Sequence, residues 1–254
     1  MSTRSVHVFA SADELAAFFT DKLRRGMASL KAGHYFSLLL SGGSTPRAVF
    51  EYLSKNQESI QWQRLQLFWG DERCVPPDQD ESNYKMAKNS LLDHVPIPSD
   101  NIYRIKGESD PQTEAVRYAE TVINRLPSIN GLPYFDLIML GLGDDGHTAS
   151  LFPNDTKNLF SDRLFEVAAQ PESGQRRVTA TLKLLNNART IVFLVTGKSK
   201  AGMLARILEK RKEWEVHPAT MRENYPASMV ETKNGEVLWL VDQDAASEYE
   251  GLPI

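Results

Sequence analysis

Residues 135–153 read FDLIMLGLGDDGHTASLFP, an apolar run that passes directly into a glycine-rich polar loop. Gly141, Gly143 and Gly146 match the G-x-G-x-x-G pattern of dinucleotide-binding folds, and the apolar run has the composition of the strand that precedes this pattern. Glu166 lies twenty residues beyond the last glycine, where such folds place a ribose-binding acid. The stretch predicts a strand of a parallel α/β sheet with a ligand-binding loop at its carboxyl end.

The same stretch argues against a nucleotide. Asp144 and Asp145 occupy the two variable positions, and their charges would oppose a pyrophosphate by about a few kcal/mol where solvation is poor. Pro153 cuts short the helix that should follow the loop. His147 is surrounded by small residues and lies beside carboxylates, the setting of a general base with an orienting acid, for which we take Asp145. We therefore predict an acid–base site and no bound nucleotide.

Apolar runs and helical patterns alternate along the chain. We predict strands at 5–9, 35–40, 64–70, 101–105, 135–141, 163–169, 176–182, 190–197 and 236–242, and helices at 12–33, 46–55, 83–93, 110–126 and 198–210. Such alternation is typical of βαβ units, so we expect a single-domain, Rossmann-like α/β fold over residues 1–254, with a mostly parallel sheet and helices on both faces. Only residues 127–133, PSINGLP, resemble a domain boundary.

Composition narrows the class of protein. The chain has 254 residues, a net charge of −4 and 41% hydrophobic residues, which is ordinary for a globular protein and disfavours nucleic-acid binding. Cys74 is the single cysteine, which excludes an intrachain disulfide and suits a reducing compartment. No apolar run reaches membrane-spanning length, and no paired-histidine spacing indicates a metal site. We expect a cytoplasmic protein with no membrane or nucleic-acid partner and no metal.

Further polar loops follow other predicted strands. SGGSTP (41–46) offers Gly42, Gly43, Ser44 and Thr45 at a helix start, either as an anion site or as a tight turn with a polar cap. DER (71–73) places Asp71 and Arg73 at a strand end, where they are either functional or solvated.

Two basic stretches have similar positions. TGKSKA (196–201) is not a P-loop, because position 192, which requires glycine, is Val192. Lys198 or Lys200, and Arg176 or Arg177, remain possible phosphate cations. Since the carboxyl ends of parallel strands share one edge, we expect residues 41–45, 71–73, 147 and 198–200 to converge on one pocket.

Together these motifs resemble the 6-phosphogluconolactonases of the sugar-phosphate isomerase-related family. The resemblance runs almost end to end and rests on LSGGSTP (40–46), FWGDERCVPPDQDESNY (68–84), LGLGDDGHTASLFP (140–153), RVTATLKLLNNAR (177–189), VTGKSKA (195–201) and WLVDQDAA (239–246). It implies hydrolysis of 6-phosphoglucono-1,5-lactone to 6-phosphogluconate, in the oxidative branch of the pentose phosphate pathway, without a metal or organic cofactor.

The resemblance also implies residue roles. His147 matches the general base, and Gly42, Gly43, Ser44 and Thr45 match the phosphate loop. Arg177 and Lys200 match the phosphate cations, whereas Asp71 and Arg73 fall in the matching active-site loop with roles left open. The oxyanion donor and the oligomeric state also stay open.

Two other functions remain as alternatives. A glucosamine-6-phosphate deaminase/isomerase would have an aromatic residue after the Asp-Glu pair and a GHIAFNEP-like run, where this chain has Arg73 and GHTASLFP. A non-catalytic sugar-phosphate-binding regulator would need the phosphate loop but not His147 with its acidic neighbours.

Overall fold

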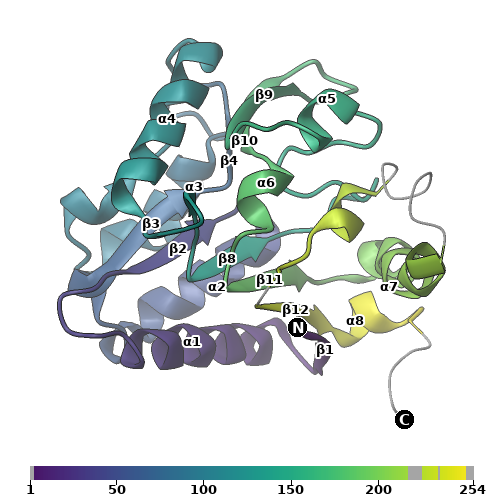
Figure 1. Cartoon of the computed structure of the whole chain (residues 1–254). Helices are drawn as coiled ribbons and strands as arrows, with labels where there is room; N and C mark the ends of the chain where they lie inside the picture. The colour runs from purple at the N-terminus through teal and green to yellow at the C-terminus, as the bar shows by residue number, and fades with distance from the viewer. Residues whose placement is uncertain (1–2, 217–224, 234, 250–254) are drawn as a thin grey trace.

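The computed structural model describes residues 3–216, 225–233 and 235–249. Its centre is a seven-stranded sheet in which all neighbouring strands run parallel (Figure 1). Across the sheet the order is β1 (Thr3–Phe9), β12 (Glu236–Asp242), β11 (Thr190–Val195), β8 (Leu137–Leu140), β2 (Phe36–Leu40), β3 (Leu65–Trp69) and β5 (Ile102–Tyr103). The predicted α/β class with a mostly parallel sheet is confirmed.

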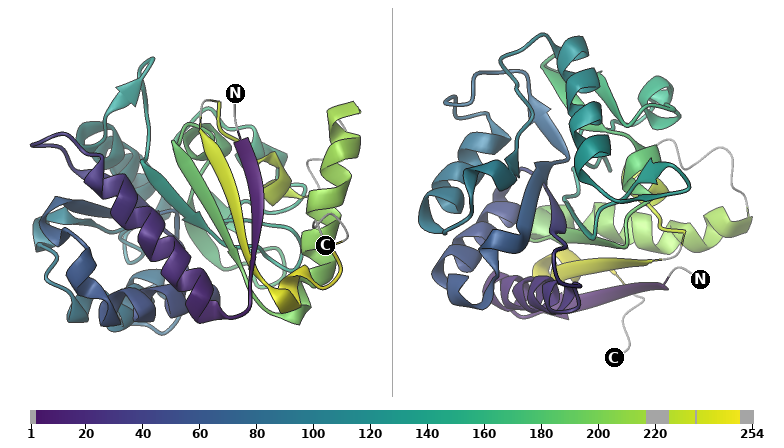
Figure 2. Two further views of the ribbon diagram at one scale, coloured as in Figure 1. Left: turned by 90° about the horizontal axis from the view of Figure 1, so that it is seen from below. Right: turned by 60° about the vertical axis from the view of Figure 1, so that its left-hand side comes forward.

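Helices flank the main sheet and the smaller sheet described below. They are α1 (Ala12–Ala28), α2 (Ser44–Lys55), α3 (Asn83–Ser90), α4 (Pro111–Arg125), α5 (Thr156–Leu159), α6 (Leu182–Leu185), α7 (Ala201–Val216) and α8 (Gln243–Ala246). Helices α1 and α2 pack side by side (Figure 2). Because helices cover them, β2, β3 and β8 are buried at every position, and they are apolar apart from Ser37 and Gln66.

Helix α1 is shorter than expected. It begins where predicted, with the Ser11 hydroxyl accepting from the Glu14 amide at 3.2 Å. It ends at Ala28 and not at residue 33, because the Ser29 hydroxyl donates to the Gly26 carbonyl at 2.7 Å and Gly33 adopts a φ of +78° in the turn that follows.

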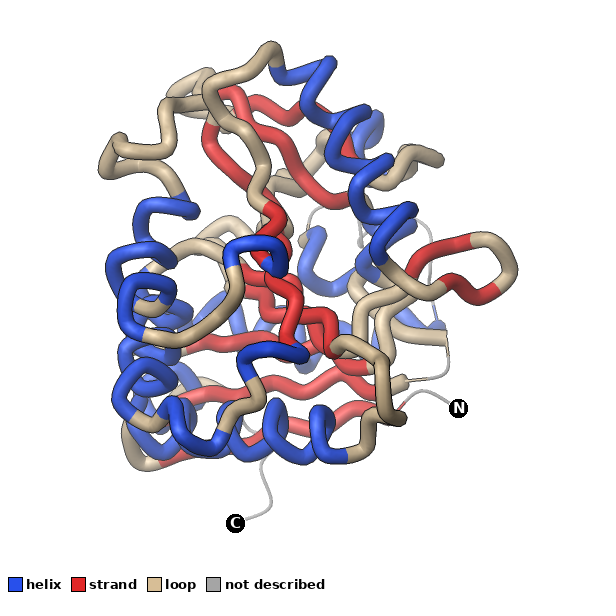
Figure 3. Tube along the Cα trace, turned by 90° about the vertical axis from the view of Figure 1, so that its left-hand side faces the viewer, coloured by secondary structure: helices blue, strands red, loops and turns tan. Residues whose placement is uncertain are grey.

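A second, antiparallel sheet accompanies the predicted, mostly parallel one. It consists of β4 (Asp71–Arg73), β10 (Arg176–Ala180) and β9 (Phe165–Ala169) and lies apart from the main sheet (Figure 3). Residues 170–175 are too few for a crossover, so β9 and β10 can pair only as a hairpin. Residues 71–73, expected as loop, form the strand that adds to this hairpin.

The stretch 127–133, the only candidate for a domain boundary, has regular structure. Residues there form a two-stranded hairpin, β6 (Ser128–Ile129) and β7 (Leu132–Pro133), whose turn residues Asn130 and Gly131 have φ of 54° and 77°. Buried side chains of both larger sheets belong to one hydrophobic cluster, which includes Leu38 and Ile138 of the main sheet and Phe165 and Val178 of the small one. The cluster supports a single domain, which stays a prediction.

The strand order reverses between β2 and β8. From β2 the chain continues to β3 on one side, whereas the strand that pairs with β8 on its other side is β11. The loops after β2 and β8 therefore leave the sheet in opposite directions and open a crevice at its carboxyl edge, the usual ligand position in open α/β sheets.

Candidate active site

A cavity of about 220 Å³ lies at this crevice. Its walls include seven residues singled out from the sequence: Gly42, Gly43, Asp71, Arg73, His147, Arg177 and Lys200. The predicted convergence of the strand-end loops is thus confirmed. The volume is below the ~300–1,000 Å³ typical of drug-sized ligand sites, which suits a small polar metabolite.

In the loop after β8, glycines leave room for the imidazole ring of His147. A Cβ on Gly143 would stand 2.1 Å from Nδ1 of His147, so only glycine lets the ring lie against the backbone. The Gly146 amide donates to the Gly143 carbonyl at 3.0 Å, and Gly146 has a φ of +86° that disfavours any side chain. Gly143 and Gly146 of the G-x-G-x-x-G pattern therefore shape a turn around His147.

His147 and Asp145 form a hydrogen-bonded pair. Asp145 Oδ1 lies 2.6 Å from Nδ1 of His147 and accepts from its backbone amide at 3.0 Å. Partial burial raises the pKa of Asp145, but the side-chain and backbone hydrogen bonds from His147 outweigh it, and the net pKa is lowered. A charged Asp145 favours a proton on Nδ1 and leaves Nε2 as the acceptor. Asp145 itself does not line the cavity.

The small sheet presents charge to the cavity. Arg73 and Arg177 are direct partners across β4 and β10, and Asp71 is opposite Thr179. Because side chains alternate along a strand, these four residues share one face, and Asp71, Arg73 and Arg177 line the cavity. Arg176 has the opposite orientation, which decides between the two adjacent arginines.

Glu72 faces away from that side and fixes the loop before α3. Its carboxylate accepts from the amides of Arg73, Asn83 and Tyr84, each at 2.8 Å. Burial raises the pKa of Glu72, and these hydrogen bonds oppose the rise. The sequence identified Glu72 only as part of the DER motif, whereas the structure shows it anchoring residues 82–84.

The two arginines keep unused donors. Arg73 Nη1 donates to the Glu81 carbonyl at 2.5 Å, but the buried Nε atoms of Arg73 and Arg177 have no hydrogen-bond partner among the described residues. Burial lowers the pKa of Arg177, to which the charge of Arg73 adds, while Asp71 opposes the shift. Two adjacent guanidinium groups without a bidentate carboxylate are suited to hold an anion.

Lys200, and not Lys198, reaches the cavity. It ends a short 3₁₀ helix (Lys198–Lys200) after β11, and its Nζ lies 2.6 Å from Oδ1 of Asp144. Asp144 is largely exposed, so an anion in the cavity can compete with it for the ammonium group.

The glycine loop after β2 is only partly at the cavity. Gly42 and Gly43 line it, whereas Ser44 and Thr45 do not, and the Thr45 hydroxyl hydrogen-bonds that of Thr196 at 2.7 Å. Asn83 was missed from the sequence. A Cβ on Gly42 would lie 1.9 Å from its Oδ1, so the glycine makes room for this buried amide. Its position at the start of α3 gave no local sign that it faces β2.

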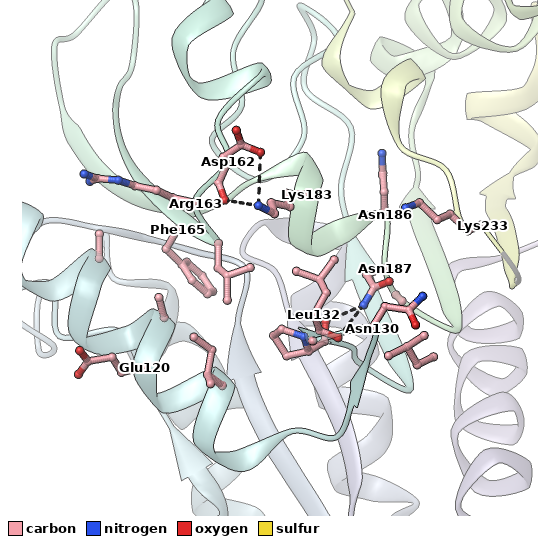
Figure 4. A pocket seen from close by; sticks show the side chains of 18 of the residues that line it. Glu120, Asn130, Leu132, Asp162, Arg163, Phe165, Lys183, Asn186, Asn187 and Lys233 are labelled. Carbon is pink, nitrogen blue, oxygen red and sulfur yellow. Dashed lines mark hydrogen bonds and ion pairs between the residues drawn. The ribbon is translucent and has the colours of Figure 1, made fainter.

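A larger hollow of about 840 Å³ lies elsewhere, between α4, the β6–β7 hairpin and α6 (Figure 4). None of the residues proposed from the sequence lines it, and its described walls contain neither histidine nor cysteine. Lys183 there donates to the Asp162 carbonyl at 2.7 Å and is 3.3 Å from its carboxylate. Acid–base chemistry therefore points to the smaller cavity.

Two further properties concern the described residues only. They contain no group of three or more histidine, cysteine, aspartate or glutamate side chains placed to hold a metal ion. None of the helices described is long and apolar enough to span a bilayer.

Comparison with known proteins places the chain in a family. Residues 10–239 match the model of the glucosamine-6-phosphate isomerases/6-phosphogluconolactonases. The chain is 45% identical to a 6-phosphogluconolactonase of Haemophilus influenzae over 216 residues, 84% of this chain and 87% of the relative. A solved structure named devB protein is 39% identical with a TM-score of 0.86, covering 97% of this chain and 99% of its own.

The 6-phosphogluconolactonase of Trypanosoma cruzi has a TM-score of 0.81 at 28% identity and covers 97% of both chains. A monomeric glucosamine-6-phosphate deaminase, 20% identical with a TM-score of 0.74, shares the fold. The chain belongs to the family of glucosamine-6-phosphate isomerases and 6-phosphogluconolactonases.

Proposed function

We propose that this protein hydrolyses 6-phosphoglucono-1,5-lactone to 6-phosphogluconate, with His147 as general base. The observation that carries the proposal is the His147–Asp145 pair beside Arg73, Arg177 and Lys200 at one small cavity. A base and a cluster of cations are what a phosphorylated ester substrate requires. The lactonase relatives from Haemophilus influenzae and Trypanosoma cruzi support this substrate class.

A lactone is an activated ester, so water can attack it without a covalent intermediate. Nε2 of His147 removes a proton from water as the oxygen adds to C1, and the carbonyl oxygen becomes an oxyanion. Collapse of this intermediate breaks the C1–O5 bond, and the imidazolium returns its proton to O5. Asp145 holds the ring and stabilises the imidazolium in between.

The phosphate of the substrate is held by cationic side chains in the wall of the cavity. Arg177 and Lys200 supply charge, and the backbone at Gly42 and Gly43 allows close approach at the start of α2. Ser44 and Thr45 lie outside the cavity walls, and Thr45 contributes by holding the turn through its hydrogen bond to Thr196. This grip is remote from C1, so it acts by positioning the substrate.

Arg73 and Asp71 have different roles in the proposed reaction. Arg73 keeps a free Nε next to Arg177 and is our choice for the donor to the oxyanion. Both oxygens of Asp71 accept hydrogen bonds, from Ser150 and Asn83. Asp71 therefore serves as an organiser of the site, and as the next candidate base should His147 fail the test.

The test is hydrolysis of freshly prepared 6-phosphoglucono-1,5-lactone, followed by acid release and corrected for spontaneous opening. A rate above background supports the proposal, and no rate with folded protein refutes it. Ammonia release from glucosamine 6-phosphate would instead identify a deaminase, against which Arg73 argues. We also propose that the reaction needs no cofactor, so NAD, NADP and FAD should not raise Tm at concentrations where 6-phosphogluconate does.

A further inference from the structure

Asp71 is a buried carboxylate beside two arginines. It is 4% exposed and shares its sheet face with Arg73 and Arg177. In such surroundings a carboxylate and a guanidinium normally form a bidentate ion pair. Among the described residues, however, neither arginine pairs with Asp71.

Two neutral side chains donate hydrogen bonds to the Asp71 carboxylate instead. The Ser150 hydroxyl donates to Oδ2 at 2.6 Å, and the Asn83 amide donates to Oδ1 at 3.3 Å and to the Asp71 carbonyl at 2.9 Å. Ser150 is fully buried and Asn83 is 3% exposed, so water does not replace them. Both oxygens of Asp71 therefore have a fixed partner.

Arg177 contacts Ser150 and forms no ion pair with Asp71. Its Nη1 lies 3.4 Å from the Ser150 hydroxyl, and its guanidinium carbon lies 5.6 Å from the centre of the Phe152 ring. The serine hydroxyl thus stands between the guanidinium and the carboxylate, and the Arg177 Nε is left without a partner.

The amino end of the main sheet, where Ser37 lies in β2 and Asp136 precedes β8, provides a comparison. There the buried Ser37 donates to Oδ2 of Asp136 from its hydroxyl and its amide, each at 3.0 Å. No amide side chain caps the second oxygen, and Arg189 Nη1 pairs with it at 3.3 Å. The same three residue types therefore produce an ion pair where the aspartate keeps a free oxygen.

We propose that Ser150 and Asn83 are positioning residues that each donate to one oxygen of Asp71, so that Arg177 forms no ion pair with it and stays available to the anionic group of the substrate. The proposal rests on the lactonase function proposed above for the nature of that group. Neither residue touches the reacting carbon in this account. They act by preventing an ion pair between Asp71 and Arg177.

Ser150→Ala tests this arrangement. Without the hydroxyl, Arg177 is expected to close onto Asp71, so KM for the phosphorylated lactone and Kd for 6-phosphogluconate should rise about 10–100-fold, the value of one charge-assisted contact. The kcat should fall much less, because His147 and Asp145 are untouched. Ser37→Ala is the matched control, since it also removes a buried serine–aspartate bond and should leave KM unchanged.

Removing the charge of Asp71 provides the rescue. In the Ser150→Ala, Asp71→Asn double variant the attraction for Arg177 is gone, so Kd should return to within about twofold of Asp71→Asn alone. A merely structural role of Ser150 would give additive losses and no rescue. A KM for Ser150→Ala within about twofold of the wild type would also overturn the proposal.

The two proposals can fail separately. The wild-type rate on the lactone tests the function, whereas calorimetric binding of inorganic phosphate to the same variants tests the release of Arg177. If the wild type is inactive but Ser150→Ala still binds phosphate more weakly than the wild type and Ser37→Ala, the reaction is refuted and the role of Ser150 is kept. If the wild type is active but the variants bind phosphate equally well, the reaction is kept and the role of Ser150 is refuted.

Discussion

Asp145→Asn separates the chemical step from binding. The substitution keeps the size of the side chain but removes the negative charge that lies 2.6 Å from Nδ1 of His147. An asparagine amide can also donate to Nδ1, which would place the proton on Nε2 and block the base. Because the imidazolium exists only after water is activated, the loss should appear in kcat and not in KM.

The size of the loss follows from the geometry. Two unit charges about 4 Å apart interact by about 1 kcal/mol in water and about 4 kcal/mol near a protein surface. The side chains of His147 and Asp145 are 30% and 47% exposed, so screening places the pair between these limits. We expect kcat to fall about 10–100-fold, which corresponds to about 1.4–2.7 kcal/mol.

Asp144→Asn is the control one residue away. It makes the same change of charge, but Asp144 pairs with Lys200 and not with His147. Freeing Lys200 should lower KM or leave it unchanged, with kcat retained. Initial rates on the phosphorylated lactone over a range of concentrations give both constants. Equal kcat losses in the two variants would refute the Asp145–His147 pair as the catalytic unit, as would a kcat for Asp145→Asn at the wild-type level.

Three further expectations follow. His147→Ala should lower kcat about 10²–10⁴-fold on phosphorylated and unphosphorylated lactones alike, with calorimetric affinity for 6-phosphogluconate nearly unchanged, and a near-normal kcat would place the base elsewhere. Arg177→Ala should raise KM about 10–100-fold for the phosphorylated lactone but much less for gluconolactone, so equal effects on the two substrates would contradict a phosphate contact. Since the pKa of Asp145 is lowered from 3.8, its pairing stabilises the fold above that pH and is lost as pH falls through the lower folded value. The Tm difference between the wild type and Asp145→Asn should therefore shrink on acidification below about pH 4, and a difference that persists or grows would contradict the pairing.

Much of the fold was readable from local patterns. Largely apolar runs such as residues 36–40 and 137–140 predicted buried parallel strands, because strands covered on both faces lack a regular alternation of polar and apolar side chains. The small antiparallel sheet was not separated from these strands. Its members β9 and β10 show the same strand propensity, and pairing of β10 with β4 joins residues about a hundred positions apart.

The loop after β8 shows how far local sequence reaches into the site. Asp145, Gly146 and His147 are neighbours in the chain, so their turn and hydrogen bonds depend on local geometry, and the sequence alone indicated a histidine beside an acid. The same stretch also indicated that its glycines do not serve a nucleotide, because two aspartates stand between them.

Tertiary structure alone decided which charges lie near that histidine. In RRVTATL either arginine could point into the cavity, and only the register of β10 against β4 selects Arg177, because a shift by one residue would reverse every side chain. Asn83 at the start of α3 and Ser150 in the loop after β8 are 12 and 79 residues away from Asp71, and no local pattern encodes such contacts. The chain specified the chemical groups through short-range order, whereas long-range strand pairing determined which of them meet.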